Sequence, residues 1–186
     1  MKKLHGLIWV AMVLFVAPSC TNDDDDDDDM AASISATDKS FILNAADGGM
    51  FEVMAGELAV AKGDTGNYMI HSDSTNVRTF GQMMITDHTK ANQELKSIAD
   101  RMQVAIPATL SAAKQQKIDS LTAASGAAFN MMYTKMMVVS HQETISLFEA
   151  EASNGDDTEI KSWASGKLPT LKHHLDMAMM MRDSIQ

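Results

Sequence analysis

Apolar residues recur at helical spacing along residues 77–102, and this pattern limits the fold of the chain more than any other feature. Successive members of the pattern are three or four positions apart, which places them on one face of an α-helix. They are Val77, Phe80, Met84, His88, Ala91, Leu95, Ile98 and Met102. Ser74 is the expected N-cap of this helix, and Pro107 lies beyond its end. A helix of this length buries such a face against other helices, so the sequence predicts a helical bundle.

Three further stretches have the same periodicity. They cover about residues 38–62, about residues 126–153, and a segment that begins after Asp157. Pro169 lies inside the last segment, where its fixed φ suits the first turn of a continuing helix better than a helix interior. Residues 63–73 contain several glycine, asparagine and aspartate residues and are expected to form a loop. We find no strand-like alternation, so we expect an all-α fold.

The connection between the second and third long helices covers residues 103–125 and is expected to contain a short helix over residues 111–121. About 23 residues, partly helical, can travel the length of a bundle. A ferritin-like bundle requires such a crossover, whereas an up-and-down bundle needs only a short loop. The expected fold is therefore a ferritin-like four-helix bundle with a long crossover.

Each of the four long stretches carries one ionisable residue near its midpoint, on its apolar side. These residues are Glu52, His88, His141 and His174. They lie within about 5 Å of the same level at 1.5 Å per residue, so side-by-side helices would bring them together in the core. Three imidazoles and one carboxylate form a ligand set that a single Zn²⁺, Fe²⁺ or Cu²⁺ ion accepts. The alternative is a metal-free polar network in which Glu52 pairs with one of the histidines.

The spacing of acidic residues disfavours a carboxylate-bridged di-iron centre. Such centres need Glu-x-x-His on two helices, because positions i and i+3 face the same metal. The positions three residues before His88, His141, His173 and His174 hold Ile85, Val138, Thr170 and Leu171. Asp87 does not replace the missing glutamate, because neighbouring helix residues point about 100° apart. The chain also lacks nucleophile-elbow, phosphate-loop and Cys-x-x-Cys motifs, so nothing supports nucleophilic catalysis, and we favour a non-enzymatic protein over an enzyme.

The chain is rich in methionine. Seventeen methionines are present, of which Met1 and Met12 belong to the expected leader. Thioethers are soft ligands that suit Cu(I), but methionine more often fills irregular gaps in a core, and we favour that interpretation. His173 with Asp176 and Met177 also has ligand-compatible spacing, which is a weak signal.

The N-terminus has the pattern of a secretory leader. Lys2 and Lys3 precede an apolar run that is too short to span a bilayer comfortably. Ala17-Pro18-Ser19-Cys20 then resembles a bacterial lipobox, although Ala17 stands where leucine is usual and Pro18 is also unusual. We expect a signal peptide over residues 1–19 and a lipid on Cys20 that anchors the chain to a membrane. The alternative is an ordinary signal peptide with a cysteine there by chance.

Seven consecutive aspartates, Asp23–Asp29, follow the cysteine and cannot pack together, so residues 20–36 are expected to form a solvated tether. This run resembles the surface-export signal of some bacterial lipoproteins, which implies an outer-membrane location, on either leaflet. Without Lys2, Lys3 and the aspartates, the net charge of −10 becomes −5 for residues 30–186. That acidity argues against a nucleic-acid partner. Cys20 is the only cysteine, so the domain expected over residues 37–186 has no disulfide.

Several motifs in order resemble a bacterial family of ferritin-like domains of unknown function, often labelled outer membrane proteins. The motifs are Phe41 to Glu52-Val53, Met84-Ile85-Thr86-Asp87-His88, Ser125-Gly126 with Phe129-Asn130 and Tyr133, Met137-Val138-Val139-Ser140-His141, and Leu168-Pro169-Thr170-Leu171-Lys172-His173-His174-Leu175. The resemblance covers about residues 37–184 and implies a ferritin-like bundle in the cell envelope. It points to His174 over His173. Asn130 stands where the family usually has aspartate, so a site that used that carboxylate would be altered here.

These observations lead to an expected function. We expect a lipid-anchored, non-enzymatic outer-membrane domain that binds a transition metal, in metal handling or envelope stress protection. The second interpretation is a structural or interaction lipoprotein whose buried histidines form only a polar network. A metal-dependent redox enzyme ranks third, because the Glu-x-x-His pairs are missing. The sequence identifies no protein partner.

Overall fold

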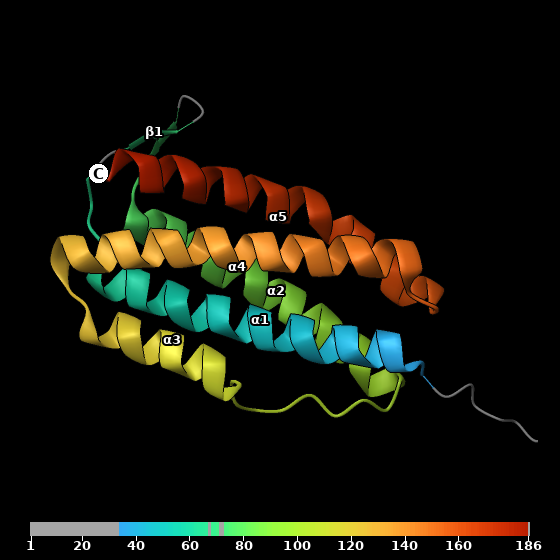
Figure 1. Ribbon diagram of the computed structural model, residues 1–186. Helices are drawn as coiled ribbons and strands as arrows, with labels where there is room; N and C mark the ends of the chain where they lie inside the picture. Colours follow the sequence, from blue (N-terminus) through green and yellow to red (C-terminus); the bar gives the residue numbers. More distant parts are fainter. Residues whose placement is uncertain (1–33, 67, 71–72, 186) are drawn as a thin grey trace, which may run out of the picture. The chain divides into compact units, whose positions relative to one another are not determined.

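Five α-helices and one small hairpin make up the part of the chain that the computed structural model describes, residues 34–66, 68–70 and 73–185 (Figure 1). The long helices are α1 (Ala36–Lys62), α2 (Val77–Arg101), α4 (Gly126–Asn154) and α5 (Thr158–Ser184), and the short helix is α3 (Ala112–Ala123). Strands β1 (Tyr68–Ile70) and β2 (Asp73–Thr75) pair antiparallel. The helical prediction is confirmed. The expected loop instead contains β1 and the start of β2.

Polar side chains cap α1, α2, α3 and α5 at their N-termini, whereas α4 begins without a side-chain cap. Ser35 Oγ accepts a hydrogen bond from the backbone N–H of Asp38 at 3.0 Å and starts α1. Asn76 and Thr79 form a reciprocal capping box at the start of α2. The prediction of Ser74 as the N-cap was therefore wrong by two residues, because that residue belongs to β2.

Helix α5 continues through Pro169, so the prediction that this residue starts a new helical turn was wrong. Proline has no backbone N–H, and α5 therefore lacks one helical hydrogen bond at this point. Ile160 and Ala164 before the proline are buried, and so is Leu171 after it. Packing of both halves against the core thus keeps them in one helix.

The crossover from α2 to α4 is attached to α1 at both ends of α3. At the start of α3, the Ser111 backbone N–H and Oγ donate to the two carboxylate oxygens of Asp47, at 2.8 and 2.7 Å. At its end, Lys62 Nζ donates to backbone carbonyls that include that of Ala124, at 3.3 Å. A cation there also complements the negative end of the α3 dipole. The predicted short helix is confirmed, and it lies beside α1 (Figure 1).

The long helices pack as two antiparallel hairpins, α1 with α2 and α4 with α5, and α1 also packs against α4. Two glycines allow α1 and α2 to approach closely. A Cβ atom added at Gly56 would lie 2.8 Å from the carbonyl oxygen of Gly81. A Cβ atom added at Gly81 would lie 2.6 Å from the Cβ atom of Ala59. Only glycine fits this contact without movement of a backbone.

Two apolar clusters fill the bundle. One contains Phe51, Ala55, Ala59, Val77, Phe80, Met84, Phe129, Tyr133, Met137, Met177, Ala178 and Met181, among others. The other contains Phe41, Ile42, Ala45, Leu95, Ile98, Ile145, Phe148, Ile160, Ala164 and Leu171, among others. Several methionines thus fill the core, as the sequence favours. On α2, α4 and α5 a buried histidine separates the two clusters, so a polar layer lies between them.

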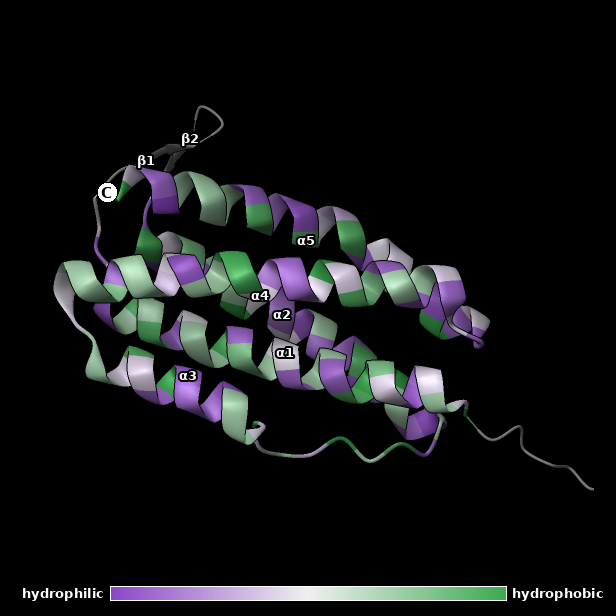
Figure 2. Cartoon of the chain, in the orientation of Figure 1, coloured by the Kyte–Doolittle hydropathy of each residue, from purple (hydrophilic) through white to green (hydrophobic). Residues whose placement is uncertain are grey.

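Each long helix carries hydrophilic as well as hydrophobic residues along its length (Figure 2). Among the described residues, no helix combines the length and the apolar character that crossing a membrane requires. The expected signal peptide (residues 1–19), the expected lipidation site Cys20 and the aspartate run lie outside the described residues.

Candidate metal centre

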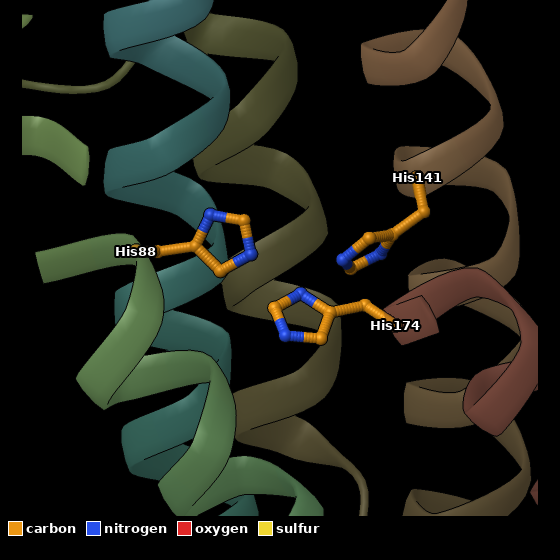
Figure 3. A group of neighbouring side chains, drawn as sticks. All are labelled: His88, His141 and His174. Carbon is orange, nitrogen blue, oxygen red and sulfur yellow. The ribbon is translucent and has the colours of Figure 1, made fainter. Parts of the chain in front are cut away.

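Three histidines from three helices meet in the polar layer (Figure 3). His88 comes from α2, His141 from α4 and His174 from α5, and their exposed fractions are 5%, 0% and 1%. The centroid of the His88 ring lies 5.6 Å from that of His141 and 5.4 Å from that of His174. The His141 and His174 rings are 5.4 Å apart. The predicted meeting of the three imidazoles is present in the structure.

Each ring directs one nitrogen toward the other two rings (Figure 3), and one nitrogen of each lies within 4.8 Å of the others. Three ring nitrogens of this cluster have no hydrogen-bond partner among the described residues: His88 Nε2, His141 Nε2 and His174 Nδ1. The other nitrogen of each ring faces an oxygen atom. Each imidazole therefore has one satisfied side and one side that is open to a ligand.

Glu52 of α1 lies beside two of the rings, opposite their open nitrogens. Its Oε2 is 3.0 Å from His88 Nδ1, and its Oε1 is 3.6 Å from His141 Nδ1. Ser140 Oγ donates a hydrogen bond to the same Oε1 at 2.9 Å. Glu52 thus lies at the predicted level, but it is not in the group of converging ligand atoms. Its carboxylate faces the outward nitrogens of two rings and contributes no atom to that group.

His141 and His174 also have outer acceptors of their own. His141 Nδ1 donates to the backbone carbonyl of Met137 at 2.8 Å, and His174 Nε2 donates to Asp87 Oδ2 at 2.9 Å. A proton held on these outward nitrogens leaves the lone pair on the inward nitrogen. This is the arrangement in which proteins present histidine to a metal, with the second ring nitrogen bonded to a carboxylate or carbonyl.

Burial and neighbouring charges shift the pKa of each group in the cluster in a different direction. Burial alone would raise the pKa of Glu52, but the charges of His88 and His141 and hydrogen bonds from His88 and Ser140 lower it, so Glu52 is a carboxylate. Burial lowers the pKa of His88, but the negative charge of Glu52 and its hydrogen bond to the ring have the larger combined effect, so the His88 pKa is raised. Burial lowers the pKa of His141. Burial and the two neighbouring histidines lower the pKa of His174 to about 4.

Sequence reasoning missed Asp87. The aspartate was discounted because it points away from its neighbour His88, but that direction carries its carboxylate to His174 on another helix. A carboxylate one position before a core histidine, facing the groove toward the next helix, is the signal that could have identified it. His173 and Asp176 are exposed and are not part of the ligand group that the described residues form.

Asn130, the departure from the expected family pattern, lies away from the histidines. Its Nδ2 donates to Asp64 Oδ2 at 2.8 Å, and its Oδ1 accepts from the Asp64 backbone N–H at 3.3 Å. An aspartate at this position would face the Asp64 carboxylate with a second negative charge. Asparagine suits this pairing because it offers both a donor and an acceptor.

Comparison with known proteins places the chain in a family. The family described as "Domain of unknown function (DUF4142)" matches residues 25–181. The chain belongs to this family. The match with DUF4142 contains Glu52, Asp87 and all three clustered histidines. No curated protein and no solved structure matches the chain.

Proposed function

We propose that this DUF4142 protein binds one divalent transition-metal ion in its core, through His88 Nε2, His141 Nε2 and His174 Nδ1. The observation that carries the proposal is the convergence of three buried nitrogens that have no partner among the described residues. A buried polar atom without a partner costs about 1–3 kcal/mol. Three of them in one place are unfavourable, unless a ligand binds all of them together.

The distances suit a metal ion after small ring rotations. Because the three nitrogens lie within 4.8 Å of one another, a point exists within about 2.8 Å of all three. Zinc–nitrogen bonds are about 2.0–2.1 Å, so each ring needs to move by less than about 1 Å. Neutral imidazoles suit Zn²⁺, Cu²⁺ and Fe²⁺, and no cysteine of the described residues belongs to the ligand group.

The charges around the site also suit a divalent cation. Glu52 lies within 3.0 Å of His88, and Asp87 lies within 2.9 Å of His174. Two carboxylates just outside the ligand nitrogens offset a charge of +2 without entering the coordination sphere. Such outer carboxylates raise the basicity of the ligating imidazoles and fix their orientation.

The same proposal includes a fold family and a location. The order of two helical hairpins joined by a long crossover that contains α3 supports a ferritin-like bundle. The lipobox-like sequence before Cys20 and the aspartates after it support a lipid anchor in the outer membrane. In that setting the protein is a non-enzymatic component of metal handling or of protection from envelope stress.

One observation favours the second interpretation, a metal-free polar network in a structural or interaction lipoprotein. Glu52 and His88 already form a buried ion pair without any metal. Such a pair can fix how helices α1 and α2 align. This pair accounts for His88 Nδ1 but not for the three unpartnered nitrogens, so we rank this function second.

Elemental analysis of the full chain, purified without an affinity tag, tests the proposal. We expect about one Zn, Fe or Cu ion per chain, and loss of that ion in the variant His141→Gln. The matched control is His173→Gln, which removes an exposed histidine next to the cluster and should keep the ion. A folded, metal-free chain that also fails to bind added Zn²⁺, Fe²⁺ and Cu²⁺ would overturn the proposal in favour of the polar network.

A further inference from the structure

A pocket of about 150 Å³ reaches the histidine cluster from the surface. His88, His174, Glu52 and Asp87 are among the residues that line it, whereas His141 does not line it. The pocket is therefore located on one side of the cluster, next to two of the three rings. Any small molecule that enters it arrives beside the proposed metal ligands.

The ligand group leaves a coordination position for such a molecule. It contains three nitrogens, and no fourth histidine, cysteine or carboxylate of the described residues joins it. Zinc sites with three protein ligands keep a fourth position for water or another exchangeable ligand, whereas structural sites use four protein ligands. With three protein nitrogens, a metal ion bound here would keep one coordination position for an exchangeable ligand.

The polar wall of the pocket favours an anion. Lys90 of α2 and Lys167 of α5 both line it, and Lys167 also pairs with Glu94 and lies 5.7 Å from the centre of the Trp163 ring. A divalent ion is balanced by the charges of Glu52 and Asp87, so the exposed Lys90 adds positive charge at the entrance. Positive charge beside a pocket raises the local concentration of anions.

The apolar wall limits the size of the ligand. Leu95, Phe148, Trp163 and Leu171 form this wall. At about 30 Å³ per water molecule in the liquid, the pocket holds roughly five waters. That space suits an ion of a few atoms.

We propose that the bound metal has a fourth coordination position that opens into this pocket and binds a small inorganic monoanion. The inference depends on the proposed function, because without a metal the pocket offers no coordination position. It adds the chemical class of the exogenous ligand, which the histidine cluster alone does not define. It also specifies the side of the cluster from which that ligand arrives.

Titration of azide into the Co²⁺-loaded full chain tests the inference. Co²⁺ has visible absorption bands that report on its ligands, and azide is a small monoanion that binds to open metal positions. We expect a saturable change in these bands. The variant Ala91→Phe fills the pocket from α2 and should retain Co²⁺ but lose the azide response, because Ala91 lines the pocket without contributing a ligand.

A charge variant provides a second measurement that does not depend on filling the pocket. Lys90→Gln should weaken azide binding by about threefold, which is the size expected for one exposed charge several ångströms away. The matched control Lys172→Gln removes a lysine of α5 that pairs with Glu149 outside the pocket, and it should change azide binding less.

The outcomes separate this inference from the proposed function. Failure of the chain to bind Co²⁺, Zn²⁺, Fe²⁺ or Cu²⁺ would overturn both. Binding of Co²⁺ with bands that azide does not change would overturn only the open position. An equal azide response in the wild-type protein and in Ala91→Phe would show that the anion reaches the metal by another route and would also contradict the inference.

Discussion

Asp87 Oδ2 accepts a hydrogen bond from His174 Nε2 at 2.9 Å, and this contact links α2 to α5 across the bundle. Asp87 is the more exposed partner, with 41% of its side chain accessible, whereas His174 is 1% exposed. The aspartate thus connects a buried ring to the surface. It holds the proton on the outer nitrogen of His174 and leaves the inner nitrogen available to a metal.

We predict that Asp87→Ala weakens metal binding by about tenfold or more, because outer carboxylates typically contribute 10–100-fold to metal affinity. Competition with a chromophoric chelator measures the Zn²⁺ dissociation constant. Asp176→Ala is the control, since it removes an exposed aspartate of α5 that does not belong to the ligand group. An unchanged dissociation constant in Asp87→Ala would show that the contact has no role in binding.

Glu52→Gln should destabilise the metal-free protein. Removal of one partner of a buried ion pair costs about 3–5 kcal/mol, because His88 then remains buried without its counter-charge. Urea unfolding in the presence of a chelator measures the free energy of unfolding. Glu57→Gln on the exposed side of α1 is the control and should change it little.

The difference in the free energy of unfolding between the wild-type protein and Glu52→Gln should depend on pH. The folded-state pKa of Glu52 is lowered, so its stabilising contribution is present above the unfolded-state pKa of about 4.5 and is lost as the pH falls below it. The wild-type and Glu52→Gln free energies should therefore converge in acid. A constant difference down to pH values well below 4.5 would contradict the assignment of Glu52 as a buried carboxylate.

Glu151 should destabilise the fold at neutral and basic pH. It is buried at the end of α4 and shares a hydrogen bond with Asp38, whose carboxylate also accepts the backbone N–H groups of Asp156 and Asp157 at 2.9 and 3.0 Å. Burial, this hydrogen bond and the nearby negative charges raise the pKa of Glu151 to about 7. A raised pKa favours the folded state only while the carboxyl group is protonated.

The sign of the pH effect follows directly. The contribution of Glu151 is complete below the unfolded-state pKa of about 4.5 and is lost as the pH rises through about 7. The loss amounts to roughly 2–3 kcal/mol. Glu151→Gln should therefore be more stable than the wild-type protein at about pH 8 and similar at about pH 5. The exposed Glu149→Gln is the control, and chemical denaturation at the two pH values measures the effect.

The same substitution should have opposite effects at two glycines. Gly81→Ala places a methyl group 2.6 Å from Ala59 Cβ and 2.9 Å from the Gly56 carbonyl oxygen, so the helices must separate, at a cost of about 1–3 kcal/mol. Gly166→Ala on α5 meets no atom within 4 Å and should stabilise the helix by about 0.5–1 kcal/mol. Thermal unfolding of both variants measures the two shifts. A lower melting temperature for both would contradict this account of the packing.

The sequence predicted the helices and the three histidines because both depend on periodicity. The four long stretches share a heptad-like apolar face and have similar lengths. When such helices pack side by side, the residues near their midpoints lie at one level of the core. The sequence could not predict the hydrogen bond between Asp87 and His174, because contacts between helices depend on how each helix is rotated toward its neighbours. It also could not place Glu52 outside the ligand group, since a long carboxylate can reach either side of an imidazole.

The sequence did not predict the β1–β2 hairpin or the continuity of α5, and the two errors have different causes. The hairpin has only three residues per strand and no alternation that distinguishes it from a polar loop. Pro169 has a strong local preference for the start of a helix, but burial on both sides of it outweighs the loss of one hydrogen bond. Local propensity is a weak guide where tertiary packing is extensive.

The residues of the site are divided between the two helical hairpins. The first hairpin contributes Glu52 and His88, and the second contributes His141 and His174, so neither hairpin alone holds all three nitrogens. An ion bound to all three would favour docking of the hairpins over the formation of either one. Metal uptake would then report on the last stage of folding. A newly made chain would acquire its metal only after its two halves have met.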